Sequence, residues 1–344
     1  MHVGVLLSAL EEPQRCGAIS GSGWNLDWPV AQLMRVGRYI LSIHGTEQKG
    51  DYQSGGDIHK FKLQPVVYII YLCGWGRARR HCATMSWRMK IATYNVNSIR
   101  RRLPIVLDWL STHQPDVFCL QETKVQDSEF PTDAIREAGY HASFRGMKGY
   151  NGVATLTKGV PDKVVHGLHE GSDNEDFRII QTVVNGIPII NSYVPQGHSI
   201  TSEKYALKII WFRRLQRYFA THLDPALPAL WVGDLNVAPE PIDVYHPDRR
   251  VNDPDFHIDA RTAFKEAVEW GFVDVFRRLH PDRVQYTYWD YFRSAFRQNF
   301  GWRIDHILAT APLAEKCVAV DVDVEPRKVA DASDHTVVWA DFNL

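Results

Sequence analysis

Acidic and amide side chains recur in this sequence at the ends of short hydrophobic stretches. Asn95 ends KIATYN, Glu122 follows VFCLQ, and Asp234 ends LWVGD. A single Asn or Asp at such a place is usually a turn former that binds its own backbone. A carboxylate next to buried residues is costly, however, unless it is paired or bound to a metal. Glu122 and Asp234 are therefore the strongest single candidates for a functional site.

Further polar residues share this placement, and strands of one sheet could present all of them along one edge. They are Asn97, Gln121, Tyr193, Asn236, Asp305, Asp334 and His335. The whole set is rich in oxygen donors and contains one His and no Cys, which suits Mg²⁺ or Mn²⁺ rather than zinc. Such a metal neutralises charge on a phosphate while a positioned base activates water. The residues alone predict a phosphodiesterase or a phosphatase.

Alternating strands and helices, expected from Met89 onward, must position these side chains. The expected strands are 90–96, 117–121, 179–184, 187–193, 229–237, 303–310, 317–324 and 336–342, and the expected helices are 100–113, 203–222 and 261–270. Asn185-Gly186 is a strong hairpin signal between two of the strands. Pro104 is expected in the first turn of the first helix, where its missing N–H costs little. Hairpins mixed with helices indicate antiparallel sheets packed on helices.

The first 88 residues differ in character from the rest of the 344-residue chain. They carry 10 Lys and Arg against 6 Asp and Glu, whereas residues 89–344 carry 29 against 34. They show no sustained hydrophobic period, so we expect a poorly ordered extension or upstream sequence translated from an early start codon. The longest apolar run, 66–73, is too short to span a membrane, and the first residues do not resemble a signal peptide. Few cysteines and no CxxC spacing favour a reducing compartment, so a cytoplasmic location is expected.

Seven segments in order resemble the motifs of exonuclease III and the related abasic-site endonucleases, within the endonuclease/exonuclease/phosphatase superfamily. The segments are TYNVNSIR, PDVFCLQETK, KGYNGVATLTK, NSYVPQG, WVGDLNVAP, GWRIDHILAT and SDHTVVWADF. The resemblance covers residues 89–344, and seven motifs in order make it highly specific. It departs from the family only slightly, because Tyr94 and Ile304 stand where other apolar residues are common.

The resemblance implies an α/β fold, a four-layered αββα sandwich of two mixed, mainly antiparallel sheets flanked by helices (DNase I-like). It also implies a Mg²⁺-dependent nuclease, with Mn²⁺ as a substitute, that cuts double-stranded DNA 5′ of abasic sites and trims 3′ ends. The expected enzyme is a monomer that contacts no membrane. Residues 89–344 would form the whole catalytic domain.

Roles for individual residues follow from the same resemblance. The metal ligands would come from Asn95, Glu122, Asp234, Asn236, Asp334 and His335, and the catalytic residues would be Tyr193, Asp234, Asn236, Asp305 and His335. Tyr288, Trp302 and Ile304 would line a small pocket for the abasic sugar, and Arg100, Lys124, Asn151 and Gln196 would contact phosphates. Whether one metal or two act, and whether Asp234 or His335 is the base, stays open.

Two other functions remain as alternatives. The chain could be a superfamily phosphodiesterase that acts on another phosphate ester, which a comparison of rates on abasic and intact duplex would reveal. It could also be a nucleic-acid-binding regulator that has kept the fold and lost catalysis. In that case binding without turnover, unchanged by Glu122→Gln, would be the signature.

Overall fold

The computed structural model describes residues 4–8, 32–36, 39–44, 87–168 and 177–344. The chain divides into two units, Met1–Ala78 and Arg79–Leu344. In the first unit, strands β1 (Gly4–Ser8), β3 (Tyr39–His44) and β2 (Gln32–Val36) pair in that order as an antiparallel sheet. The prediction that residues 1–88 are poorly ordered falls mostly outside the described residues and stays a prediction.

The second unit contains two six-stranded sheets. In sheet order, the first comprises β14 (Cys317–Asp323), β15 (Val337–Asn343), β4 (Arg88–Asn95), β5 (Val117–Gln121), β7 (Tyr150–Thr157) and β6 (His141–Met147). The second comprises β12 (Phe272–Asp274), β13 (Asp305–Thr310), β11 (Leu230–Asp234), β10 (Ile187–Tyr193), β9 (Ile179–Val184) and β8 (Lys163–His166). Only the pairs β4–β5 and β10–β11 are parallel. Both sheets are therefore mixed and mainly antiparallel, as predicted.

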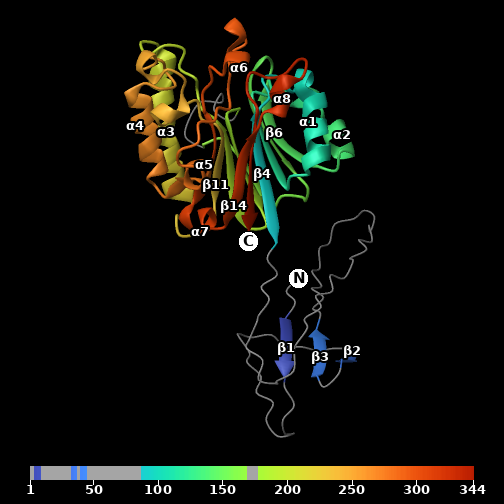
Figure 1. The fold of residues 1–344 in the computed structure, drawn as a ribbon. Coiled ribbons are helices and arrows are strands. Elements are labelled where there is room, and N and C mark those ends of the chain that lie inside the picture. The colour runs from blue at the N-terminus through green and yellow to red at the C-terminus, as the bar shows by residue number, and fades with distance from the viewer. Residues whose placement is uncertain (1–3, 9–31, 37–38, 45–86, 169–176) are drawn as a thin grey trace, which may run out of the picture. The chain divides into compact units, whose positions relative to one another are not determined.

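Helices cover the outer face of each sheet (Figure 1). The structure has α1 (Ile99–His113) and α2 (Thr132–Glu137) on one side, α3 (Glu203–His222) and α4 (Ile258–Val268) on the other, and four short helices, α5 (Val275–Leu279), α6 (Ala295–Gln298), α7 (Ala311–Ala314) and α8 (Glu325–Lys328). Within the residues that the structure describes, the 3₁₀ turns η1 (Asp127–Glu129), η3 (Pro241–Asp243), η4 (Pro247–Arg249) and η5 (Phe292–Ser294) lie in loops. In the part of the chain that the structure describes, no helix combines the length and apolar character needed to cross a membrane.

The central strands are buried on both faces, and their alternation divides the core into layers. In β5, Val117 and Cys119 point between the sheets, whereas Phe118 and Leu120 pack with α1. The same alternation places Trp231 of β11 against α3 and α4. Successive side chains of a strand point to opposite faces, so continuous apolar runs are the expected sequence of a central strand. The four-layered sandwich is thus confirmed.

Polar side chains cross between the two sheets near the ends of β5 and β10. The Gln121 amide donates to Asn191 Oδ1 at 2.7 Å and to Thr93 Oγ1 at 2.9 Å. The Asn191 amide in turn donates to the Ala154 carbonyl at 2.9 Å. All four residues are fully buried, and each of these polar groups finds a partner there.

Most predicted elements appear close to their expected bounds. Asn185 and Gly186 both have positive φ, 50° and 76°, as a two-residue hairpin turn requires. Two predictions were wrong in detail. Pro104 lies inside α1 rather than in its first turn, because the helix begins at Ile99. The predicted strand 229–237 ends at Asp234, because Asn236 turns into the left-handed region at φ 49°.

Candidate active site

One half of the site comes from the sheet that contains β4 and β5. These strands run parallel with Asn95 opposite Gln121, so Asn95 and the following Glu122 lie at the same edge. The Asn95 amide donates to Glu122 Oε1 at 2.8 Å. His335 comes from the turn before β15, which pairs with β4 on its other side. The predicted convergence of these three residues is therefore observed.

The other half comes from the second sheet. Tyr193 and Asp234 end the parallel strands β10 and β11 and lie opposite each other. Asp305 begins β13 and is paired with Asp234 in the antiparallel register. The Asn95 amide reaches across from the first sheet and donates to Asp234 Oδ2 at 2.7 Å. One amide thus bridges a carboxylate of each sheet.

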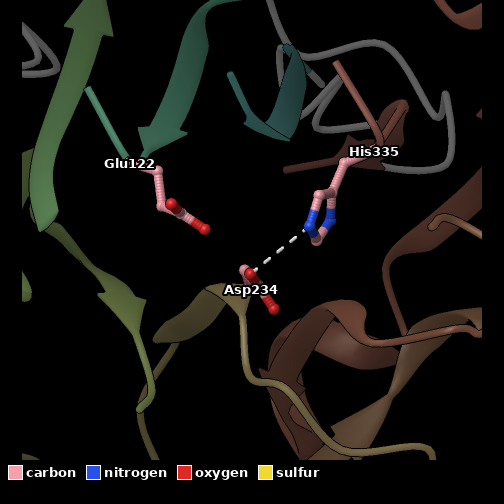
Figure 2. Close-up of side chains that lie close together, drawn as sticks. All are labelled: Glu122, Asp234 and His335. Carbon is pink, nitrogen blue, oxygen red and sulfur yellow. Dashed lines mark ion pairs between the residues drawn. The ribbon is translucent and has the colours of Figure 1, made fainter. Parts of the chain in front are cut away.

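Glu122, Asp234 and His335 point toward one another (Figure 2), each with one potential ligand atom within 4.8 Å of the others. His335 Nε2 lies 3.7 Å from Asp234 Oδ2. Asp334, a predicted metal ligand, is not part of this group: its Oδ1 accepts from the Asn97 amide at 2.9 Å. A carboxylate pair with a nearby imidazole and amide is a donor set that a hard divalent cation fits.

Asp305 fixes the orientation of His335. His335 Nδ1 lies 2.8 Å from Asp305 Oδ2, so Nδ1 carries the proton of this bond and Nε2 faces the cluster. Burial alone would lower the pKa of His335, but the carboxylates of Asp305 and Asp234 raise it to about 10. The other carboxylate oxygen of Asp305 is buried without a hydrogen-bond partner. The site therefore has more acceptor capacity than the chain itself satisfies.

The two clustered carboxylates have opposite pKa shifts. Burial raises the pKa of Asp234 well above its usual value, reinforced by Asp305 and Glu122, and outweighs the opposing effect of His335. For Glu122, burial also favours the neutral acid, but Lys124 and Asn95 hold its pKa below the usual value. Lys124 Nζ lies 2.7 Å from Glu122 Oε2. Lys124, predicted to contact phosphate, is thus already an ion-pair partner inside the site.

The backbone around the site is held in conformations that non-glycine residues rarely adopt. Glu122 and Lys124 have φ of 51° and 54°, and Asn236 has 49°. Such residues each cost of order 1–3 kcal/mol and persist where their surroundings fix them. The strand beside the Glu122 turn must come very close, since a Cβ added at Gly152 would lie 2.1 Å from the Thr123 hydroxyl. Asn151 belongs to this contact, because its carbonyl accepts from Lys124 N at 2.9 Å.

Asn236 and Tyr193 lie beside the clustered acids. The Asn236 side chain donates to the Val194 carbonyl at 2.9 Å, and its backbone N–H donates to Asp234 Oδ1 at 3.0 Å. Burial and the carboxylates of Glu122 and Asp234 raise the pKa of Tyr193 well above its usual value, so it remains a neutral phenol. The Arg178 guanidinium lies over the Tyr193 ring, 4.7 Å from its centroid. Arg178 was not predicted, because it directly precedes β9 and belongs to no motif of the sequence.

The three predicted pocket residues lie together next to His335. Tyr288 and Trp302 exchange backbone hydrogen bonds of 2.9 Å, and the Tyr288 ring lies 4.9 Å from the His335 ring. Ile304 is 2% exposed and packs with Val244 as the floor of this apolar cluster. The structure therefore brings the pocket residues to the edge of the acidic cluster, with Ile304 more buried than a pocket wall would be.

The remaining predicted phosphate contacts lie at the periphery. Arg100 is exposed and forms an ion pair with Glu129 at 3.0 Å. The Gln196 amide donates to Asp255 Oδ2 at 3.3 Å, and the Asn151 amide approaches the Met147 sulfur at 3.5 Å. These contacts place the three side chains but do not test binding, so their phosphate roles stay predictions.

Comparison with known proteins gives consistent matches. Residues 92–335 match the model of the Endonuclease/Exonuclease/phosphatase family. The chain is 34% identical over 266 residues to the exodeoxyribonuclease III of Haemophilus influenzae, covering 74% of this chain and all of that protein. Among solved structures, an AP endonuclease from Archaeoglobus fulgidus matches with a TM-score of 0.72 and 48% identity, over 74% of this chain and all of that one. The Neisseria 3′ phosphatase NExo, solved bound to a product DNA hairpin, matches with a TM-score of 0.71 and 35% identity over the same shares.

Proposed function

The chain belongs to the endonuclease/exonuclease/phosphatase family, and from this premise we propose that it is a metal-dependent DNA repair nuclease. It hydrolyses the phosphodiester 5′ of an abasic site in duplex DNA, leaving a 3′-hydroxyl, and also trims 3′ ends. The observation that carries the proposal is the cluster of Glu122, Asp234 and His335 at converging strand ends, with His335 oriented by Asp305. The names of the matched relatives support the DNA repair substrate.

The residues of the cluster fit a divalent cation. Glu122, Asp234 and Asp305 place three buried or nearly buried carboxylates together, against the two cationic groups of Lys124 and His335. Oxygen donors of this kind suit Mg²⁺, with Mn²⁺ as a substitute. Glu122 and Asp234, with the Asn95 amide beside them, would hold it. When bound, the cation neutralises negative charge on the phosphate oxygens.

The chain's own groups supply the proton transfer. The Asp234 carboxylate takes a proton from the attacking water, whose oxygen bonds to phosphorus as the bond from phosphorus to the 3′-oxygen breaks. The electron pair of the broken bond stays on the departing 3′-oxygen, which takes a proton from solvent water and becomes the 3′-hydroxyl. Asn236 orients the water beside Asp234, and His335 Nε2 binds a phosphate oxygen. The contact of His335 Nδ1 with Asp305, which leaves Nε2 facing the cluster, supports this division.

The apolar cluster beside His335 supports selection of abasic sites. Tyr288 and Trp302 are the proposed contacts of a sugar flipped out of the duplex, and the buried Ile304 would limit the depth that such a sugar could reach. Extruding a nucleotide without a base forfeits little stacking energy. A site too shallow for a base would thus accept the abasic sugar and reject an intact nucleotide.

The test is cleavage of a duplex with one abasic site, compared with the same duplex intact, with Mg²⁺ and with EDTA. We expect a single cut 5′ of the abasic site, abolished by EDTA and restored by Mg²⁺ or Mn²⁺. Cleavage that survives EDTA would contradict the metal requirement. Equal rates on both duplexes, or hydrolysis of only another phosphate ester, would contradict the substrate.

Three finer assignments belong to the same proposal. Residues 89–344 form the catalytic domain, the enzyme is a monomer, and it works in the cytoplasm. Light scattering of the purified protein measures the second, and localisation of a tagged chain measures the third. A dimer, or a chain found at a membrane, would contradict them.

A further inference from the structure

One lysine lies on the buried face of α3, where the pattern requires apolar residues. Tyr205, Phe212, Leu215 and Phe219 form this face together with Lys208, whose exposed fraction is 0%. A fully buried ammonium is costly unless every N–H finds an acceptor. The location of Lys208 therefore needs an explanation that helix packing does not supply.

The Lys208 ammonium is surrounded by oxygens from three loops. Nζ lies 2.5 Å from the Asn236 carbonyl, 3.0 Å from the Pro254 carbonyl and 3.1 Å from the Gln196 carbonyl. It also forms an ion pair with Asp255 Oδ1 at 2.7 Å. An ammonium has three N–H donors, so these four acceptors saturate it.

Two of the three loops that Lys208 joins follow directly from residues of the site. Asn236 follows Asp234 by two residues, and Gln196 follows Tyr193 by three. Asp255, the anion of the pair, also accepts from the Gln196 amide at 3.3 Å and, through its backbone carbonyl, from Ala238 N at 2.7 Å. Lys208 and Asp255 are thus the common anchor of the loops after β10 and β11.

The anchored loop cannot hold its shape by local preference alone. Asn236 has a φ of 49°, in the left-handed region, and its carbonyl points at Lys208 while its side chain bonds Val194. On the other side, His306 Nε2 lies 2.8 Å from the Val237 carbonyl. Two consecutive carbonyls are therefore each held by a buried side chain, which fixes the peptide planes on either side of Val237.

We propose that Lys208 is a positioning residue for the proposed hydrolysis: its ammonium holds the Asn236 carbonyl, so that the Asn236 side chain keeps its place beside the attacking water. Lys208 itself touches neither substrate nor metal. The kinetic test of this inference rests on the proposed function, whereas a second test, by hydrogen exchange, needs no substrate.

Lys208 is buried and Asp255 largely so, and burial shifts the pKa of each in the direction that favours its neutral form. Burial lowers the pKa of Lys208, while Asp255 and Asp234 act against that shift. Burial likewise raises the pKa of Asp255, and Lys208 opposes it. Lys208→Met keeps the length and the apolar stem of the side chain. It removes the N–H donor from the carbonyls of Gln196, Asn236 and Pro254.

The kinetic arm is a double-mutant cycle with Lys208→Met and Asn236→Ala. If Lys208 acts through Asn236, Lys208→Met lowers kcat about 10- to 100-fold in the wild-type chain, as displacement of a positioned group does, and about twofold or less in the Asn236→Ala background. Equal losses in both backgrounds would overturn the proposal, as would a kcat within twofold of wild type. Lys208→Gln, which keeps an N–H donor, is expected to fall between wild type and Lys208→Met.

The substrate-independent arm is hydrogen exchange of the peptide covering residues 235–240. Leu235 and Ala238 donate to the carbonyls of Ile304 and Asp255, so their amides report whether this loop is held. Lys208→Met should speed their exchange at least tenfold, whereas Leu215→Ala, which destabilises the same helix face, should speed exchange only as far as its lower global stability accounts for. Unchanged exchange in Lys208→Met overturns the proposal even if the chain cleaves no DNA. If Lys208→Met does not fold, Lys208→Gln carries both arms.

Discussion

Asp234→Asn removes the carboxylate that is proposed both to take the proton from water and to share in holding the metal, so its effect on turnover is measured at saturating Mg²⁺. The change removes one charge and keeps the shape of the side chain. Its Oδ1 can still accept from Asn236 N, now at 3.0 Å, but the new NH₂ group would face the Asn95 amide, which now donates to Oδ2 at 2.7 Å. One hydrogen bond is therefore lost, at a cost of about 1 kcal/mol. Removing this carboxylate relieves repulsion from Glu122 and Asp305 but also loses its attraction to His335, and these two effects oppose each other.

The expected effect on turnover is much larger than this structural cost. A positioned acid or base contributes about 10²–10⁴-fold to a rate, which corresponds to roughly 3–5 kcal/mol of activation free energy. We therefore expect kcat on an abasic duplex to fall by at least about 10²-fold. The free energy of unfolding in EDTA should change by about 1 kcal/mol or less, and DNA affinity should be nearly unchanged.

The assay combines single-turnover cleavage, binding of the same duplex in Ca²⁺, and urea unfolding in EDTA. Asp224→Asn is the matched control. Asp224 is exposed in the loop before β11 and therefore lies near the start of this strand, whereas Asp234 lies at its other end. It should leave kcat and binding unchanged. The reasoning is refuted if Asp234→Asn keeps its kcat within tenfold of wild type, or if DNA binding weakens as much as turnover.

The remaining predictions concern the metal, the pocket, stability and the extension. Glu122→Gln should raise the Mn²⁺ concentration for half-maximal cleavage by about tenfold or more, and an unchanged titration would remove Glu122 from the ligands. Trp302→Ala should lower the ratio of abasic to intact cleavage at least about tenfold, and a constant ratio would assign Trp302 to the core alone. Asp274→Asn should cost about 3–5 kcal/mol of unfolding free energy at pH 7, because Arg303 and His306 hold the pKa of Asp274 well below its usual value despite burial. This difference from wild type should shrink as the pH falls below about 4, the unfolded pKa. A difference that stays constant from pH 7 to pH 3 would contradict the pairing. Deleting residues 1–86 should leave abasic cleavage within about twofold, and a larger loss would give that segment a role.

Much of the fold could be predicted because its central strands carry local signals. The strands 117–121, 179–184 and 187–193 and helix α3 have the bounds that the sequence predicted. The hairpin of β6 and β7 was not predicted, because the alternation in β6, HASFRGM, rests on only two apolar residues, Ala142 and Phe144, and its side chains are at most partly buried. Edge strands such as β8, four residues long, are defined by their neighbours rather than by their own composition.

The residues of the site could likewise be predicted only where a neighbouring strand has a local signal in the sequence. Glu122, Asp234 and His335 could be found because each follows or precedes a strand whose end is visible in the sequence. Which atoms meet could not be predicted: Lys124 turns back onto Glu122 instead of facing solvent, and Asp334 bonds Asn97. Such contacts depend on left-handed backbone at single residues and on packing between sheets, neither of which has a sequence period. Lys208 could have been found from the sequence, because a charged residue within the apolar face of a predicted helix is unusual.

The buried amides between the sheets also bear on how the site keeps its geometry. Apolar side chains tolerate sliding, whereas the bonds from Gln121 to Asn191 and from Asn191 to the Ala154 carbonyl have a fixed direction and length. These hydrogen bonds therefore hold the two sheets in a single alignment. Glu122 comes from one sheet and Asp234 from the other, so this alignment sets the spacing of their carboxylates. A substitution at Asn191 is therefore expected to change that spacing, although Asn191 is not part of the cluster.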